Sequence, residues 1–139
     1  MARRFHALSN FDYNDRRHYR SGTGRTSGTA LASNADEWQY VIEGTIKVTM
    51  FGAHGRFRTE LLHTGDVCYI AQGYGHSIES IGSEPSRILI GFNSGTYESI
   101  DLSAWIAGNP VDVLATNFGK SESLIRQFPR KDVFIAPTE

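Results

Sequence analysis

Apolar and polar residues alternate through the middle of the chain, a pattern typical of half-buried β-strands. Between Thr45 and Met50, for example, Ile46 and Val48 alternate with polar neighbours. Turn residues separate similar stretches, which predict strands at 38–42, 45–50, 57–62, 66–71, 76–81 and 87–92. Short strands at this spacing predict an all-β sandwich or barrel.

The apolar pattern changes after residue 98, where helical spacing replaces the alternation. It predicts short helices at 102–106, 111–117 and 121–128, and a closing strand at 133–135. We expect Gly119 to end the second helix and Ser121 to cap the third. The chain therefore divides into a barrel over 34–98 and a helical extension over 99–139. Such helices would cover a sheet edge or a subunit interface.

The first segment, residues 1–33, shows neither the alternating nor the helical apolar period. It has six arginines against two aspartates and contains no Val, Ile, Lys or Glu. We therefore expect the segment to be irregular, because this composition is typical of disordered chains. An excess of arginine over acidic residues is also found in organelle transit peptides.

The composition of the whole chain is that of one globular domain. It has 139 residues, of which 40% are hydrophobic and 21% charged, with a formal net charge of −1. We expect no nucleic-acid partner, because there is no basic excess, and no membrane span, because no apolar run approaches about 18 residues. Without an apolar leader, a cytoplasmic location is expected. The single cysteine, Cys68, lies in an apolar strand and is expected to be a buried structural thiol.

Two stretches contain the residues that could bind a ligand or take part in a reaction. Residues 36–44 include Glu37, and residues 65–80 include His76. Glu37, His76 and the glycines around them have the spacing of the two motifs of the cupin superfamily. The chain resembles one half of the oxalate decarboxylase and spherulin-like bicupins.

The resemblance extends beyond the two motifs, over about 34–135, and it implies a fold and a function. We expect a cupin jelly-roll barrel that holds manganese and acts on oxalate, a small carboxylate, giving formate and carbon dioxide. Glu37 and His76 would be metal ligands, since carboxylate and imidazole suit manganese, iron or zinc. Bicupin relatives pair their barrels, which is consistent with a homodimer. The alternatives are that Glu37 is a solvated strand carboxylate and that His76 is a hydrogen-bonded core residue.

Besides the mild replacements Ala71 and Ser80 in the second motif, four positions depart from the family pattern in ways that affect its chemistry. Ala30 and Ala32 replace the two histidines of the first motif, and Ser27 replaces an arginine. Ile90 lies where decarboxylating halves have a glutamate that donates a proton. A two-ligand remnant would bind a divalent ion weakly, because such sites need three or four protein ligands. We therefore predict an impaired oxalate decarboxylase-like cupin, with a non-catalytic binding or storage module as the alternative.

A shifted reading frame would explain these departures. If the codons for residues 23–33 are read one nucleotide out of step, their degeneracy permits Pro-Gly-Gly-Leu-Arg-Glu-Leu-His-Trp-His-Pro, which then joins Asn34 in frame. This string places an arginine at the position of Ser27 and histidines at those of Ala30 and Ala32. We therefore hypothesise that the segment ending at residue 33 is out of frame. The chain would then be the defective product of a damaged bicupin gene.

Overall fold

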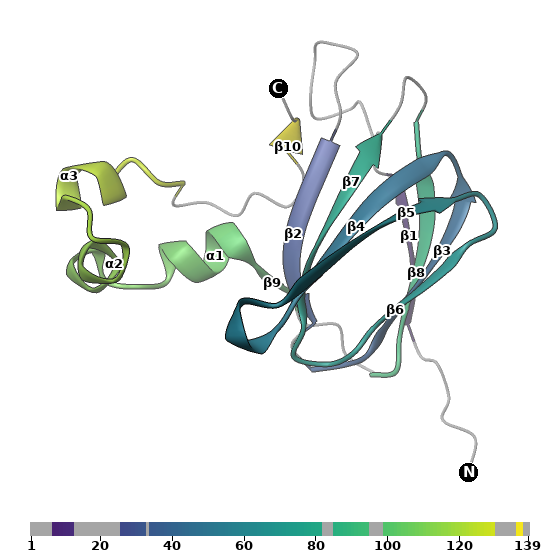
Figure 1. Ribbon diagram of the computed structural model, residues 1–139, viewed down its shortest axis with the longest axis horizontal. Helices are drawn as coiled ribbons and strands as arrows, with labels where there is room; N and C mark the ends of the chain where they lie inside the picture. The colour runs from purple at the N-terminus through teal and green to yellow at the C-terminus, as the bar shows by residue number, and fades with distance from the viewer. Residues whose placement is uncertain are drawn as a thin grey trace.

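Two antiparallel β-sheets face each other and enclose the core of the protein (Figure 1). The computed structural model describes residues 7–12, 26–32, 34–81, 85–94, 99–129 and 136–137. Within these ranges the chain is mostly β-strand, with short helices toward its C-terminal end, as the sequence predicted. No helix among them combines the length and apolar character that crossing a membrane requires.

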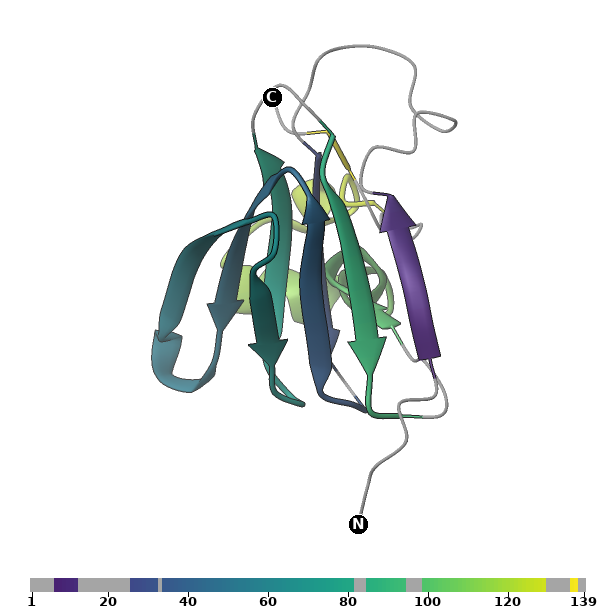
Figure 2. The same ribbon diagram turned by 90° about the vertical axis from the view of Figure 1, so that its right-hand side faces the viewer.

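The first sheet has the strand order β1-β8-β3-β6. Figure 2 shows these strands side by side. Their bounds are β1 Ala7–Asp12, β8 Arg87–Phe92, β3 Glu37–Glu43 and β6 Val67–Ile70.

The second sheet has the order β10-β2-β7-β4-β5, and β9 also pairs with β2. Its strands are β10 Ala136–Pro137, β2 Thr26–Ala32, β7 Gly75–Ile81, β4 Thr45–Phe51, β5 Phe57–His63 and β9 Ser99–Asp101. The predicted hairpin turn between β4 and β5 is a short 3₁₀ turn, η1 Ala53–Gly55.

The core lies between the sheets and is made by the alternating apolar positions. Ile46 and Val48 are buried, while their polar neighbours on β4 are only half-buried. The cluster consists of Ala35, Val41, Ile46, Val48, Ile70, Ile78, Ile88, Ile90 and Phe92. Gly44 joins β3 in one sheet to β4 in the other with a φ of 86°. A side chain there would meet the backbone of Ser86 at 2.8 Å, so this turn requires glycine.

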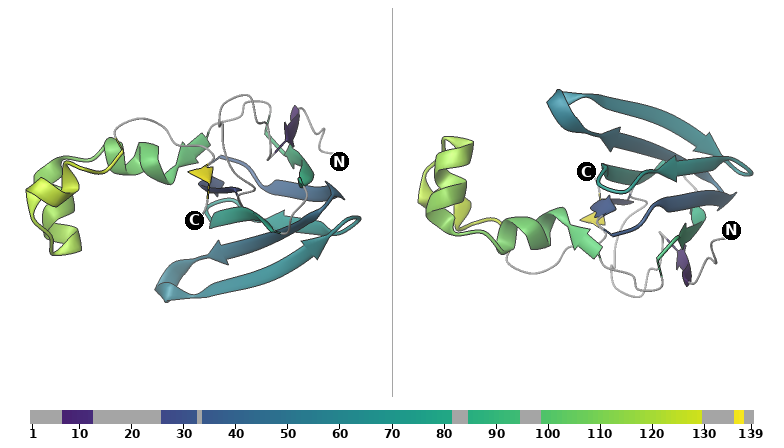
Figure 3. Two further views of the ribbon diagram at one scale, coloured as in Figure 1. Left: turned by 90° about the horizontal axis from the view of Figure 1, so that it is seen from above. Right: turned by 90° about the horizontal axis from the view of Figure 1, so that it is seen from below.

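The three C-terminal helices extend away from the two sheets (Figure 3). They are α1 Leu102–Ala107, α2 Val111–Phe118 and α3 Glu122–Ile125. Gly119 ends α2 in the left-handed conformation, and the Ser121 side chain accepts a hydrogen bond from the backbone of Leu124, as predicted. Helices α2 and α3 pack on each other and bury Leu114 and Ile125.

Two strands lie in the segment for which the sequence predicted irregular structure. β1 pairs with β8 and β2 pairs with β7. These pairings use backbone groups, so they do not need the apolar alternation on which the prediction relied. Residues 1–6, 13–25 and 33 lie outside the described residues, as does the closing strand predicted at 133–135.

Candidate metal centre

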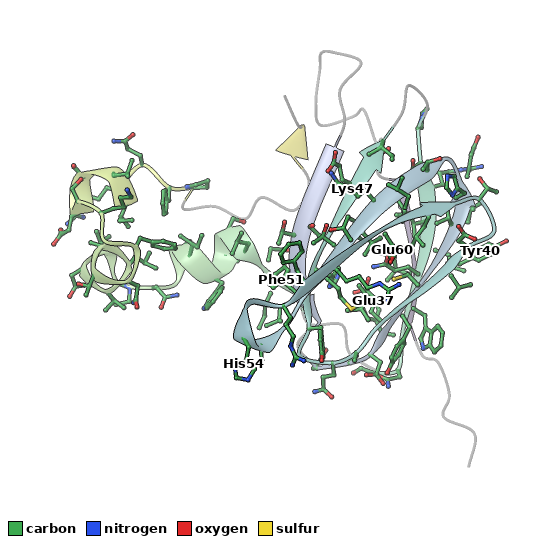
Figure 4. The ribbon with its side chains drawn as sticks, viewed as in Figure 1. Glu37, Tyr40, Lys47, Phe51, His54 and Glu60 are labelled. Carbon is green, nitrogen blue, oxygen red and sulfur yellow. The ribbon has the colours of Figure 1, made fainter. Side chains whose placement is uncertain are left out.

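Glu37 and His76 meet in the space between the two sheets. Glu37 comes from β3 in the first sheet, and His76 comes from β7 in the second. The Glu37 Oε2 atom lies 3.4 Å from the His76 Nε2 atom, and the two residues are 5% and 3% exposed. Figure 4 shows Glu37 in this enclosed space. The sequence thus identified two residues that the fold brings together, and neither is a solvated surface group.

The alternation of β3 explains the inward position of Glu37. Glu37, Gln39 and Val41 are buried, whereas Trp38 and Tyr40 between them are exposed on the outer face.

Asp36 anchors the start of this strand. Its carboxylate accepts hydrogen bonds from the backbone N–H of Gln72, at 3.0 Å, and from the side-chain amide of Asn93, at 2.6 Å. Asn93 in turn accepts a hydrogen bond from the backbone N–H of Asp36. These hydrogen bonds join the start of β3 to the end of β8 and to the β6–β7 connection, so they restrict the position of Glu37.

Gln39 is a third buried polar residue of the site, and the sequence analysis did not single it out. It is fully buried, and its Nε2 group donates a 2.7 Å hydrogen bond to Glu37 Oε1. That bond leaves Oε2 as the carboxylate oxygen next to His76. Within the described part of the chain, His76 Nδ1 and Gln39 Oε1 are buried without a hydrogen-bond partner. The signal that could have identified Gln39 is its spacing, two residues from Glu37 on the same strand face.

The register places the predicted lost-ligand positions next to His76. Ala30 on β2 is directly opposite His76, and Ala32 is two residues further along the same strand. Ile90, where the resemblance implies a glutamate, is buried on β8 opposite Gln39. Among the residues that the structure describes, no three or more His, Cys, Asp or Glu side chains are grouped so that they could hold a metal ion.

Cys68 borders the site from β6, where it is paired with Gln39. Burial raises the pKa of its thiol, and the negative charge of Glu37 raises it further, against a smaller opposing effect of a backbone hydrogen bond from Tyr69. The thiol therefore stays protonated and packs partly against the core. This agrees with the structural role expected from its apolar strand.

Comparisons with known proteins place these features in context. Residues 28–126 match the family model described as Cupin. The chain is 32% identical over 102 residues to the oxalate decarboxylase OxdC of Bacillus subtilis (strain 168), covering 71% of this chain and 26% of that protein. It is also 32% identical over 87 residues to a probable oxalate decarboxylase of Arthroderma benhamiae, covering 60% and 21%. The chain thus spans about a quarter of the length of the curated relatives it matches.

Solved structures of oxalate decarboxylase have a similar backbone. A deletion mutant of the Bacillus subtilis enzyme OxdC matches with a TM-score of 0.77 and 29% identity, covering 84% of this chain and 31% of that one. The structure of the Bacillus subtilis enzyme at pH 4.6 matches with a TM-score of 0.74 and 30% identity, covering 81% and 30%.

Proposed function

We propose, because this chain belongs to the cupin family, that it is an oxalate decarboxylase-like barrel whose manganese centre has lost half of its ligands. The carrying observation is that Glu37 and His76 converge from opposite sheets with 3.4 Å between their nearest polar atoms. Two donor atoms that each lie about 2.1 Å from one ion are at most about 4.2 Å apart. The pair is therefore suited to act as two ligands of a single ion.

The residues present do not complete a manganese site. A carboxylate and an imidazole are suitable donors, but a stable site needs three or four protein ligands. Ala30 lies opposite His76, and neither Ala30 nor Ala32 has a side-chain atom that can bind a metal. We therefore assign no reaction step to a metal in this chain.

Proton transfer is also impaired. Ile90 is 5% exposed and has no ionisable group at the position where the resemblance implies a glutamate. Decarboxylation of oxalate needs a proton at the carbon that becomes formate, and general acid catalysis requires a positioned donor. We expect this chain to show no turnover of oxalate.

A shifted reading frame over the segment that ends at residue 33 is our explanation for the missing ligands. The register supports it, because the shifted string would put a histidine at position 30, opposite His76. Sequencing the locus across the codons for residues 21–36 tests the idea. We expect that one inserted or deleted base restores the motif, and codons at 30–33 that cannot encode it when shifted would refute the hypothesis.

Restoring the histidines tests the metal centre itself. We would measure bound manganese by elemental analysis and titration calorimetry in the parent chain and in Ala30→His/Ala32→His. The matched control is Thr29→His/Leu31→His, which adds two histidines at the alternate positions of the same strand. We expect less than one ion per chain in the parent and control, and one in the restored variant. A full equivalent in the parent, or no gain on restoration, would contradict the proposal.

The second candidate is a metal-free barrel that binds a small polar molecule. The unpartnered, buried His76 Nδ1 and Gln39 Oε1 favour it, because buried polar groups normally have hydrogen-bond partners. In such a barrel a small polar molecule would bind the parent chain without manganese, so titration of the parent with and without the ion tests this candidate.

A further inference from the structure

The space between the sheets borders solvent along β5 and β6, since each is the terminal strand of its sheet. Strand β5 also contacts β3, which provides Glu37. Glu60 of β5 is paired with Val48, which is buried in the core, so it shares the inner face of the sheet. Side chains on the inner face of β5 therefore lie at the solvent-exposed edge of the space between the sheets.

The pairing of β5 identifies those side chains. Leu62 is partly buried against the core, so Arg58 and Glu60 share its face of the strand. Met50 on β4 is opposite Arg58 on one side and His76 on the other. Arg58, Met50 and His76 thus form one row across three strands, which places the Cα atoms of Arg58 and His76 about 10 Å apart.

Arg58 places a positive charge on this inner face. From β3 to β8, the inward positions include four ionisable side chains other than the Cys68 thiol, namely Glu37, Arg58, Glu60 and His76. Within those strands, Arg58 is the only inward arginine or lysine.

The present partner of Arg58 is its strand neighbour. The Arg58 Nε atom donates a 2.6 Å hydrogen bond to Glu60 Oε1, and the two side chains are 77% and 53% exposed. Exposed ion pairs are weak, so the guanidinium can exchange Glu60 for another carboxylate. Its planar fork suits a carboxylate better than a lysine ammonium does.

We propose that Arg58 binds the carboxylate of a small organic anion at the mouth of the barrel, and that Glu60 holds its guanidinium when no anion is present. The inference rests on the proposed function in one respect, since it takes the ligand to be a small carboxylate. It does not require a bound metal, because Arg58 and Glu60 lie on the edge strand β5 and are not among the proposed ligands.

Titration of the purified chain with oxalate, without added metal, tests the role of Arg58. We expect Arg58→Gln to bind oxalate about tenfold more weakly than the parent, which corresponds to loss of one charge-assisted interaction. Glu60→Gln should bind more tightly, because it removes both the competing partner and a repelling charge. Arg56→Gln is the matched control, since Arg56 is an exposed arginine just outside the strand, and its affinity should equal that of the parent.

Three outcomes would overturn this inference: no oxalate binding by the parent, equal losses in Arg58→Gln and Arg56→Gln, or no gain in Glu60→Gln. Because Arg58 and Glu60 are exposed, their substitution should leave the fold intact. Manganese binding by Ala30→His/Ala32→His does not involve Arg58. Failure of the oxalate titration would therefore not contradict the proposed metal centre, and failure of the manganese measurement would not contradict the anion site.

Discussion

Strands β2 and β3 follow one another in the chain, lie in opposite sheets and approach the same histidine from two directions. β3 brings Glu37 to within 3.4 Å of His76 and supports it with Gln39. β2 runs directly beside His76 but has Ala30 at the paired position. Both strands are paired within their sheets, but of these two positions next to His76 only Glu37 has a side chain that could donate to a metal.

The comparison separates what holds the barrel together from what gives it chemistry. Backbone hydrogen bonds pair β2 with β7 whatever its side chains are, and the apolar cluster comes from β3, β4, β6, β7 and β8 together with Ala35. A metal centre, in contrast, depends on a few side chains at particular register positions. The fold can therefore form whether or not the side chains at those positions bind a metal.

The largest expected effect tests the fold side of this comparison. Ile46→Ala removes a fully buried side chain from β4, far in register from Ala30. We expect the free energy of unfolding to fall by about 2–5 kcal/mol, measured by urea denaturation. Leu61→Ala is the control, because Leu61 is 53% exposed on the adjacent strand and should change stability by about 0.5 kcal/mol or less. Equal losses would show that the apolar cluster is not what stabilises the barrel.

The strands from β3 to β8 could be predicted from the sequence because their apolar residues alternate. The predicted strand at 87–92 coincides with β8, and Gly119 ends its helix as expected. β1 and β2 could not be predicted in this way, since residues 7–12 and 26–32 have no such period and are held by backbone pairing to distant strands.

The candidate site was predictable only in part. Glu37 and His76 could be identified because they belong to spaced motifs. Gln39 could have been placed beside Glu37 by its spacing on the same strand, but the position of Arg58 could not, because it depends on which strands are neighbours and which residues are paired. Cross-strand register is set by the whole sheet and cannot be read from one strand.

The second-largest expected effect tests how Gln39 supports Glu37 on β3. Gln39→Leu removes the amide that donates to Glu37 Oε1 and leaves a buried carboxylate oxygen without its donor. We expect a loss of about 1–3 kcal/mol in the free energy of unfolding. Replacing both residues, as Glu37→Leu/Gln39→Leu, should recover part of that loss, because the unpaired charge is then also gone. If the double variant loses as much as the sum of the single variants, the two side chains act independently.

The smallest expected effect is that of the Glu37 charge on the reactivity of the Cys68 thiol. Burial raises the pKa of the Cys68 thiol and the Glu37 carboxylate raises it further, so Glu37→Gln should lower that pKa and speed alkylation by iodoacetamide. The control is Glu60→Gln, which removes a carboxylate from another strand and should leave the rate unchanged. Equal rates in the parent and in Glu37→Gln would mean that Glu37 does not act on the thiol.

Titration of the Cys68 thiol also makes the free energy of unfolding depend on pH, and the direction of this dependence can be worked out. Because its pKa is higher in the folded chain than in the unfolded chain, the folded state binds more protons above the unfolded value of about 8.5. The free energy of unfolding must therefore decrease as the pH rises through this window. Cys68→Ser lacks this thiol and should show a flatter pH profile in urea denaturation between about pH 8 and pH 10. A profile as steep as that of the parent would place the titrating group elsewhere and remove Cys68 as a reporter for Glu37.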